Sequence, residues 1–108
     1  MRSIAAANRF YRKANKKYFG GKLPPVQIFY KRMKLIAQVR YDRKWKPTRI
    51  LLNVRLKIWP SVCAMSLLHE MAHIDLVYVQ GDTRTYHGPP WGRIMRRLAR
   101  EGAFDNLW

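Results

Sequence analysis

Acidic residues are scarce in this sequence. Six Asp and Glu stand against 22 Lys and Arg, which gives a formal net charge of +16 at pH 7 and an isoelectric point of about 10.9. A small domain needs only a few net charges to stay soluble. The imbalance therefore points to an acidic partner, most often a nucleic acid.

Cysteine and long apolar segments are scarce as well. The single cysteine, Cys63, excludes an internal disulfide, which fits a reducing compartment. The first ten residues lack the apolar centre of a signal peptide, and no run approaches the roughly 18 apolar residues that predict a membrane span. We therefore expect a cytoplasmic protein that engages no membrane, associated with the nucleoid, or nuclear if the source is eukaryotic.

The sequence does contain enough apolar residues to fold. Its 108 residues are 48% hydrophobic, which predicts one domain over residues 1–108, and we expect a monomer. The charge is unevenly divided, because residues 1–60 carry 17 basic side chains and one acid, whereas residues 61–108 carry five of each sign. We expect residues 1–60, a basic helix plus sheet, to face nucleic acid and residues 61–108 to perform hydrolysis.

Residue periodicity predicts a helix, a small sheet and two further helices. Ser3 and Ser61 are candidate N-caps, and Gly20-Gly21 ends the first helix. The polar, basic segment 42–48 is typical of an exposed loop. The order predicts an α+β fold with helices on one face of a three-stranded sheet. The expected elements are a helix over 4–18, strands over 26–30, 35–41 and 49–54, and helices over 61–79 and 91–100.

The second predicted helix contains the sequence His69-Glu70-Met71-Ala72-His73. Residues four apart lie on one face of a helix, so His69 and His73 can bind one metal ion, while Glu70 can reach a water on that ion. This HExxH arrangement is typical of zinc hydrolases. A chance match in a chain of this composition is on the order of one in a thousand.

The third ligand of such a site has one histidine candidate. A catalytic zinc usually takes three protein ligands and leaves the fourth position for water. His87, the only other histidine, precedes Gly88-Pro89-Pro90, where glycine gives backbone freedom and the prolines stiffen the approach to the next helix. We therefore expect His69, His73 and His87 to hold one Zn²⁺ ion.

Other side chains also have the chemistry to bind a metal. Glu101 and Asp82 are weaker carboxylate alternatives to His87. Asp75 follows His73 by two residues, which turns it to the opposite face of the helix. Cys63 lies too far along the helix axis to share the ion, and we expect it to pack in the core.

The basic half also carries aromatic residues, a combination suited to single-stranded nucleic acid. Rings on the helix stripe and within strands are expected to pack in the core. Trp45 is the exception, because it lies between two lysines in a polar loop. We predict contacts with DNA, single-stranded in preference, or with RNA, from Arg40, Arg43, Lys44, Trp45, Lys46 and Arg49.

On these residues the sequence resembles a SprT-like (Spartan-type) zinc metalloprotease domain reduced to its catalytic core. The specific part is the run 67–73, which contains HExxH, followed by His87-Gly88-Pro89-Pro90-Trp91. Weaker similarity covers residues 15–24, 31–33, Ala37 and residues 50–53. Three positions depart from the residues usual in the family. Gln38 stands where Gly is usual, Pro90 where an acid is usual, and Trp91 where Phe is usual.

The resemblance implies a minimal zincin fold, three histidine ligands, and proteolysis of proteins bound or crosslinked to DNA, with nucleic acid stimulating cleavage. Zinc in such a site lowers the pKa of its water and polarises the peptide carbonyl, while Glu70 takes the proton of the attacking water and returns it to the leaving amine. Tyr86 and Arg84, in the loop before His87, are candidate donors to the oxyanion.

Two other functional classes compete with a peptidase. One is a non-enzymatic module in which zinc stabilises a small core while the basic face binds nucleic acid. The other is a metal-dependent nuclease, which the sequence disfavours because such sites generally need several carboxylate ligands.

Overall fold

The N-terminal helix forms where the spacing of apolar residues predicts it. In the computed structural model, which describes residues 3–105 and 107, α1 spans Ile4–Tyr18. Ser3 is its N-cap, and the Ser3 Oγ accepts a hydrogen bond of 3.0 Å from the Ala6 backbone N–H. Gly20 and Gly21 follow with φ of 60° and 72°, so the chain reverses where glycine carries no steric penalty.

The sheet has three strands in the order β1-β3-β2, with bounds β1 Gln27–Lys31, β2 Ala37–Tyr41 and β3 Pro47–Asn53. Strand β3 pairs parallel to β1 and antiparallel to β2, which leaves β2 at one edge. The predicted loop over 42–48 is shorter than expected, because Pro47 starts β3. Proline is tolerated there because it is the first residue of the strand and lies beside a register shift.

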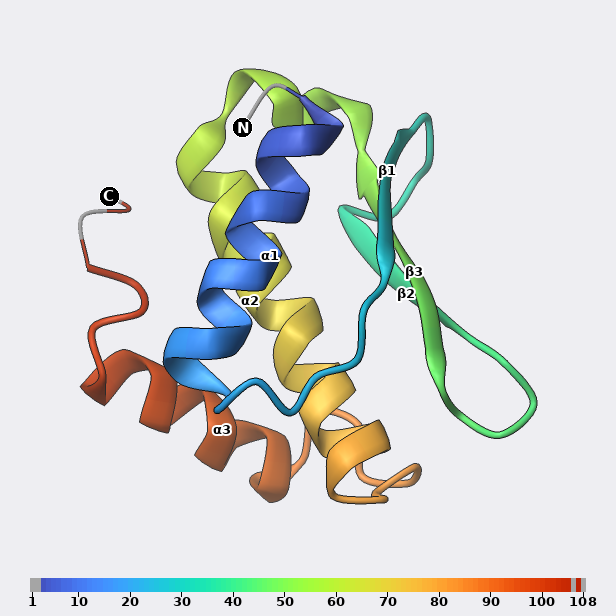
Figure 1. Cartoon of the computed structure of the whole chain (residues 1–108), viewed down its shortest axis with the longest axis vertical. Helices are drawn as coiled ribbons and strands as arrows, with labels where there is room; N and C mark the ends of the chain where they lie inside the picture. Colours follow the sequence, from blue (N-terminus) through green and yellow to red (C-terminus); the bar gives the residue numbers. More distant parts are fainter. Residues whose placement is uncertain (1–2, 106, 108) are drawn as a thin grey trace.

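The two faces of the sheet differ in character. Ile28, Ile50 and Val39 are register partners on the face that packs against α1 and α2. Figure 1 shows both helices on this side of the sheet. No helix among the described residues covers the opposite face, which exposes alternate residues, among them Phe29 and Arg40. The predicted α+β fold with one covered sheet face is therefore confirmed.

The central helix α2 spans Pro60–Ile74 and follows a short 3-10 helix, η1, at Val54–Ile58 that the sequence did not predict. The expected N-cap at Ser61 is wrong, because Trp59 is the N-cap residue and the helix begins at Pro60. Proline fits the first turn, where its missing N–H would have no helical partner. A π-helical turn, η2 at Asp75–Val79, continues α2 to the predicted end of the helix.

The run from Pro60 to Val79 is long and apolar enough to cross a membrane by length and composition, which the sequence analysis did not anticipate. Of its most apolar window, 56% is buried inside the fold. Leu67, Leu68, Met71 and Ile74 lie in the core with the sheet and α1. This burial is typical of a core helix, whose apolar surface is covered by its own protein.

The last helix, α3, spans Pro89–Arg100, two residues earlier than predicted, since Pro89 and Pro90 form its first turn. Ile94 and Leu98 are its buried residues and pack into the same core as α2. Figure 1 shows α3 crossing below α1 and α2. The loop between η2 and α3 is thereby held close to the C-terminal part of α2.

Candidate metal centre

Three imidazoles converge from two segments of the chain. His69 and His73 lie one turn apart on α2, and His87 approaches from the loop before α3. The Nε2 atoms are 3.2 Å apart for His69 and His73, 2.8 Å for His73 and His87, and 3.2 Å for His69 and His87. Tetrahedral ligands at about 2.0–2.1 Å from zinc are separated by roughly 3.3 Å. The three nitrogens therefore fit around one tetrahedral ion.

The surroundings keep two of these imidazoles, those of His69 and His73, in the neutral form that binds metals. Burial, and then the neighbouring His69 and His87, lower the pKa of His73 to about 4. Burial and the charge of His87 also lower the pKa of His69. Neutral imidazoles have a free lone pair for a metal, so at neutral pH little proton competition opposes binding at these two positions.

The loop that carries His87 is shaped by Asp82. The Asp82 carboxylate accepts hydrogen bonds from the backbone N–H groups of Arg84 and Thr85, each 3.0 Å, and from the Thr85 hydroxyl. The Gly88 N–H then donates to the Thr85 carbonyl at 2.8 Å. A Cβ at Gly88 would lie 3.0 Å from that carbonyl oxygen, so any larger residue would crowd this close turn.

Aromatic rings pack around the three histidines. The Trp91 ring centroid lies 4.9 Å from that of His69, 5.4 Å from that of His73 and 4.8 Å from that of His87. The Tyr86 ring stacks on that of His73, with their centroids 4.9 Å apart, and the Tyr86 backbone has a positive φ of 52°. Trp91, where the resembled family usually has Phe, thus restricts the orientation of all three rings.

Glu70 lies beside the histidines without joining their cluster. It lines, with His69 and His73, an open cavity of about 840 Å³ between α2 and the edge strand β2. Burial raises the pKa of Glu70 to about 7. A carboxylate with a pKa near neutrality can both accept and release a proton under physiological conditions.

The alternative ligands are not part of the histidine cluster. Glu101 and Asp75 both interact with Arg97, at 2.9 Å and 4.0 Å. Asp82 holds the His87 loop, and the Cys63 Sγ is buried 3.6 Å from the Tyr30 hydroxyl. Within residues 3–105 and 107, the cluster able to hold a metal consists of the three histidines alone.

Only one of the two predicted oxyanion donors lines the cavity, and a third candidate, which the sequence analysis missed, lines it as well. Tyr86 lines the cavity, whereas Arg84 does not. Tyr41 also lines it, and its hydroxyl is buried without a hydrogen-bond partner among the described residues. Burial, and then the charges of Glu70 and Tyr86, raise the pKa of Tyr41. The strand pattern gave no signal for this role, since aromatic residues in strands usually pack in the core.

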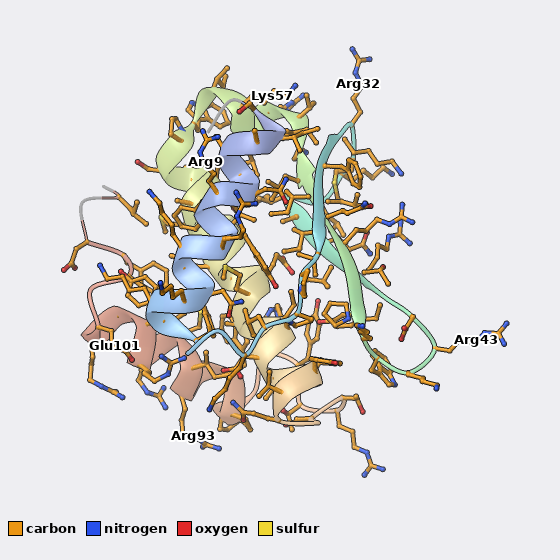
Figure 2. The ribbon with its side chains drawn as sticks, viewed as in Figure 1. Arg9, Arg32, Arg43, Lys57, Arg93 and Glu101 are labelled. Atoms are coloured by element: carbon orange, nitrogen blue, oxygen red, sulfur yellow. The ribbon has the colours of Figure 1, made fainter. Side chains whose placement is uncertain are left out.

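The predicted nucleic-acid contacts are divided between two places. Arg40 and Arg49 are register partners on the open face of the sheet. Trp45 instead packs against Tyr41, with ring centroids 5.7 Å apart, and lines the cavity. The basic residues of the β2–β3 loop are exposed, and Figure 2 shows Arg43 pointing away from the fold at its tip.

One comparison with known proteins identifies a family. The sequence model of the SprT-like family matches residues 7–106, nearly the whole chain. Neither the curated proteins nor the solved structures contain a match to this chain.

Proposed function

Because the chain belongs to the SprT-like family, we propose that it is a zinc-dependent endopeptidase with Glu70 as general base and acid. One observation carries this proposal. The Nε2 atoms of His69, His73 and His87 lie within 3.2 Å of one another. Glu70 lines the same cavity as His69 and His73. A metal and a titratable carboxylate on one open cavity are the parts that hydrolysis of a peptide bond needs.

The donor set suits zinc. Three imidazoles are ligands that zinc accepts at tetrahedral angles, and three protein ligands leave one position open. When bound, zinc would supply Lewis-acid activation of a water and of the peptide carbonyl. Trp91 and the Asp82-capped loop keep the imidazoles in place for that ion.

Two side chains of this cavity take part in the reaction, one in proton transfer and one in stabilising the oxyanion. The Glu70 carboxylate accepts the proton of the attacking water and delivers it to the leaving amine. The Tyr86 hydroxyl donates a hydrogen bond to the oxygen on which negative charge develops. Its position on the cavity, stacked on His73, favours it over Arg84.

The walls of the cavity fit an extended peptide. Strand β2 is an edge strand, and its Ala37, Gln38 and Val39 line the cavity opposite α2. An edge strand offers unpaired backbone groups to which an extended peptide can add by hydrogen bonds. The carboxylate-rich ligation typical of nucleases is lacking among the described residues of the cluster, so a peptide is the better substrate.

We further propose that nucleic acid stimulates the enzyme and that its substrates are proteins bound or crosslinked to DNA. The open face of the sheet supports this. Phe29 is 38% exposed there, and Lys31, Arg40 and Arg49 surround it in a shallow hollow. Arg40 and Arg49 lie directly opposite one another, and like charges in this position destabilise a sheet unless an anion neutralises them.

This face is suited to a single strand of DNA or RNA. Phe29 offers a ring on which a base can stack, and the arginines can contact phosphates. Figure 2 shows nitrogen-ended side chains projecting from the sheet away from the helices, with Arg32 and Arg43 at the tips of the two strand-connecting loops.

Peptide cleavage tests the enzymatic proposal. Zinc-loaded wild type should cut an unfolded protein at internal peptide bonds, and Glu70→Gln should bind one zinc equally well while cutting at least a hundredfold more slowly. A wild type as inert as Glu70→Gln, with nucleic-acid binding intact in both, would instead favour a zinc-stabilised binding module.

Fluorescence anisotropy with a labelled oligothymidylate tests the nucleic-acid face. Arg40→Gln/Arg49→Gln should weaken binding about tenfold or more at low salt. The control Arg9→Gln/Arg12→Gln removes the same charge from α1 and should weaken binding much less. Equal losses in the two variants would show that the net charge, and not the sheet face, binds the nucleic acid.

A further inference from the structure

The cavity extends past the histidines toward the beginning of α2. Leu35 and Ile36 in the β1–β2 loop and Val62 in the first turns of α2 are 55%, 60% and 43% exposed, and all three line the cavity together with Met65. Figure 1 shows this loop and the start of α2 at the same end of the molecule. The catalytic cavity therefore ends in an apolar section, which we define as Leu35, Ile36, Val62 and Met65.

Asn53 holds the backbone of the loop that carries the exposed aliphatic side chains. The Asn53 Nδ2 donates to the carbonyl oxygens of Met33 and Leu35, at 2.8 Å and 3.1 Å, and its backbone N–H donates to the Ile36 carbonyl at 2.8 Å. A fixed loop loses little conformational freedom when a ligand binds against it. The loop backbone that carries Leu35 and Ile36 is therefore preformed.

Helix geometry gives the distance between the apolar section and the metal ligands. Val62 and Met65 precede His69 by seven and four residues, on the same cavity-lining side of α2. At 1.5 Å per residue they lie about 10 Å and 6 Å from His69 along the helix axis. An extended peptide advances about 3.3 Å per residue, so these distances correspond to the second and third substrate residues from the cleaved bond.

We infer that the apolar section is a specificity subsite that selects a large aliphatic or aromatic side chain two or three residues from the cleaved bond. The inference rests on the proposed peptidase function. Continuity with the histidine cavity identifies the occupant as the substrate peptide itself. Lys34, which also lines this end of the cavity, disfavours a basic side chain at the same position of the substrate.

Peptide binding to Glu70→Gln tests the subsite without relying on turnover. Two fluorescent peptides are compared by anisotropy, identical except for Leu or Ser at the second and third residues on either side of a fixed central bond. The Leu peptide should bind at least tenfold more tightly, because burying each added methylene is favourable. Leu35→Ser/Val62→Ser, made in the Glu70→Gln background, should remove this preference.

The matched control is Ile58→Ser/Val79→Ser in the same background. These residues are 65% and 38% exposed and do not line the cavity, so the preference should persist. Equal binding of the two peptides by Glu70→Gln, or equal loss in the two double variants, would overturn the inference and leave the peptidase proposal intact. Preferred binding of the Leu peptide without any cleavage by wild type would support the apolar section and contradict the peptidase proposal.

Discussion

At the scale of single residues, Glu70 is a carboxylate placed among apolar and imidazole side chains. Burial raises its pKa in the folded protein to about 7, above its ordinary value of 4.5. The folded state therefore binds a proton that the unfolded state releases, and the stability that this proton provides is lost as the pH rises from about 4.5 through 7.

We therefore expect Glu70→Gln to stabilise the metal-free protein as the pH rises. The two proteins should have similar unfolding free energies near pH 4.5, and the variant should be more stable by about 3 kcal/mol at pH 8. Urea unfolding at a series of pH values, with a chelator present, measures the difference. A constant difference across this range would contradict the raised pKa of Glu70.

Replacing Tyr41 with Phe should lower activity without lowering stability. Its buried hydroxyl has no partner among the described residues, so Tyr41→Phe should leave the unfolding free energy unchanged or raise it by up to about 1 kcal/mol. If the hydroxyl serves the substrate or Glu70, kcat should fall at least several-fold. Thermal unfolding and a cleavage assay on the same preparation measure both, and unchanged kcat would exclude a catalytic contribution from Tyr41.

The sequence identified candidate residues through local spacing but could not identify contacts that depend on the fold. His69, Glu70 and His73 share one helical turn, so their neighbourhood follows from helix geometry. Tyr41 and Trp91 reach the site only because β2 and the start of α3 pack beside α2. The polar neighbours of Trp45 in the sequence led to the prediction that it contacts a nucleic acid. Its contact with Tyr41 could not be predicted, because it depends on the conformation of the hairpin loop.

At the scale of elements, the loop between η2 and α3 determines where His87 lies. Removing its cap with Asp82→Ala should loosen the loop and lower zinc affinity about 10- to 100-fold. The control Asp42→Ala removes a similar cap, because Asp42 accepts hydrogen bonds from the backbone N–H groups of Lys44 and Lys46 in the β2–β3 loop. Competition with a chromogenic chelator measures zinc affinity, and equal affinities of Asp82→Ala and wild type would contradict the role of this loop.

The predicted elements are confirmed in type and order, and the differences lie at their ends. Ser3 caps α1 as expected, whereas Ser61 does not cap α2, because Pro60 already occupies the first turn. The parallel pairing of β1 with β3 also could not be predicted, since both neighbours of a central strand are chosen by tertiary packing. Similarly, η1 has no periodic signal over its five residues.

At the scale of the whole molecule, the described basic residues of 1–60 lie on α1, on the strands, and in η1 and the connecting loops. The basic residues of α1 are exposed, and Lys31, Arg40 and Arg49 of the strands lie on the open face of the sheet. If nucleic acid binds to the sheet face, only the basic residues on that face should contact its phosphates. The logarithm of the oligonucleotide affinity should fall linearly with that of the salt concentration, and Arg40→Gln/Arg49→Gln should reduce the slope by about 2.

The salt dependence of Arg9→Gln/Arg12→Gln provides the comparison for this slope. These residues contribute equal charge from α1, so the slope should stay near that of wild type. Affinities measured by anisotropy at several salt concentrations determine both slopes. A slope reduced equally in the two variants would assign binding to the overall charge of the molecule.

Cleavage of a basic DNA-binding protein, followed with and without single-stranded DNA, tests the central claim most directly. Zinc-loaded wild type and Glu70→Gln are compared under identical conditions, with zinc content measured in both. The account predicts fragments from wild type, faster cleavage when DNA is added, and no cleavage by Glu70→Gln at equal zinc content. Equal behaviour of the two proteins, with intact substrate in every arm, would contradict a nucleic-acid-stimulated zinc endopeptidase.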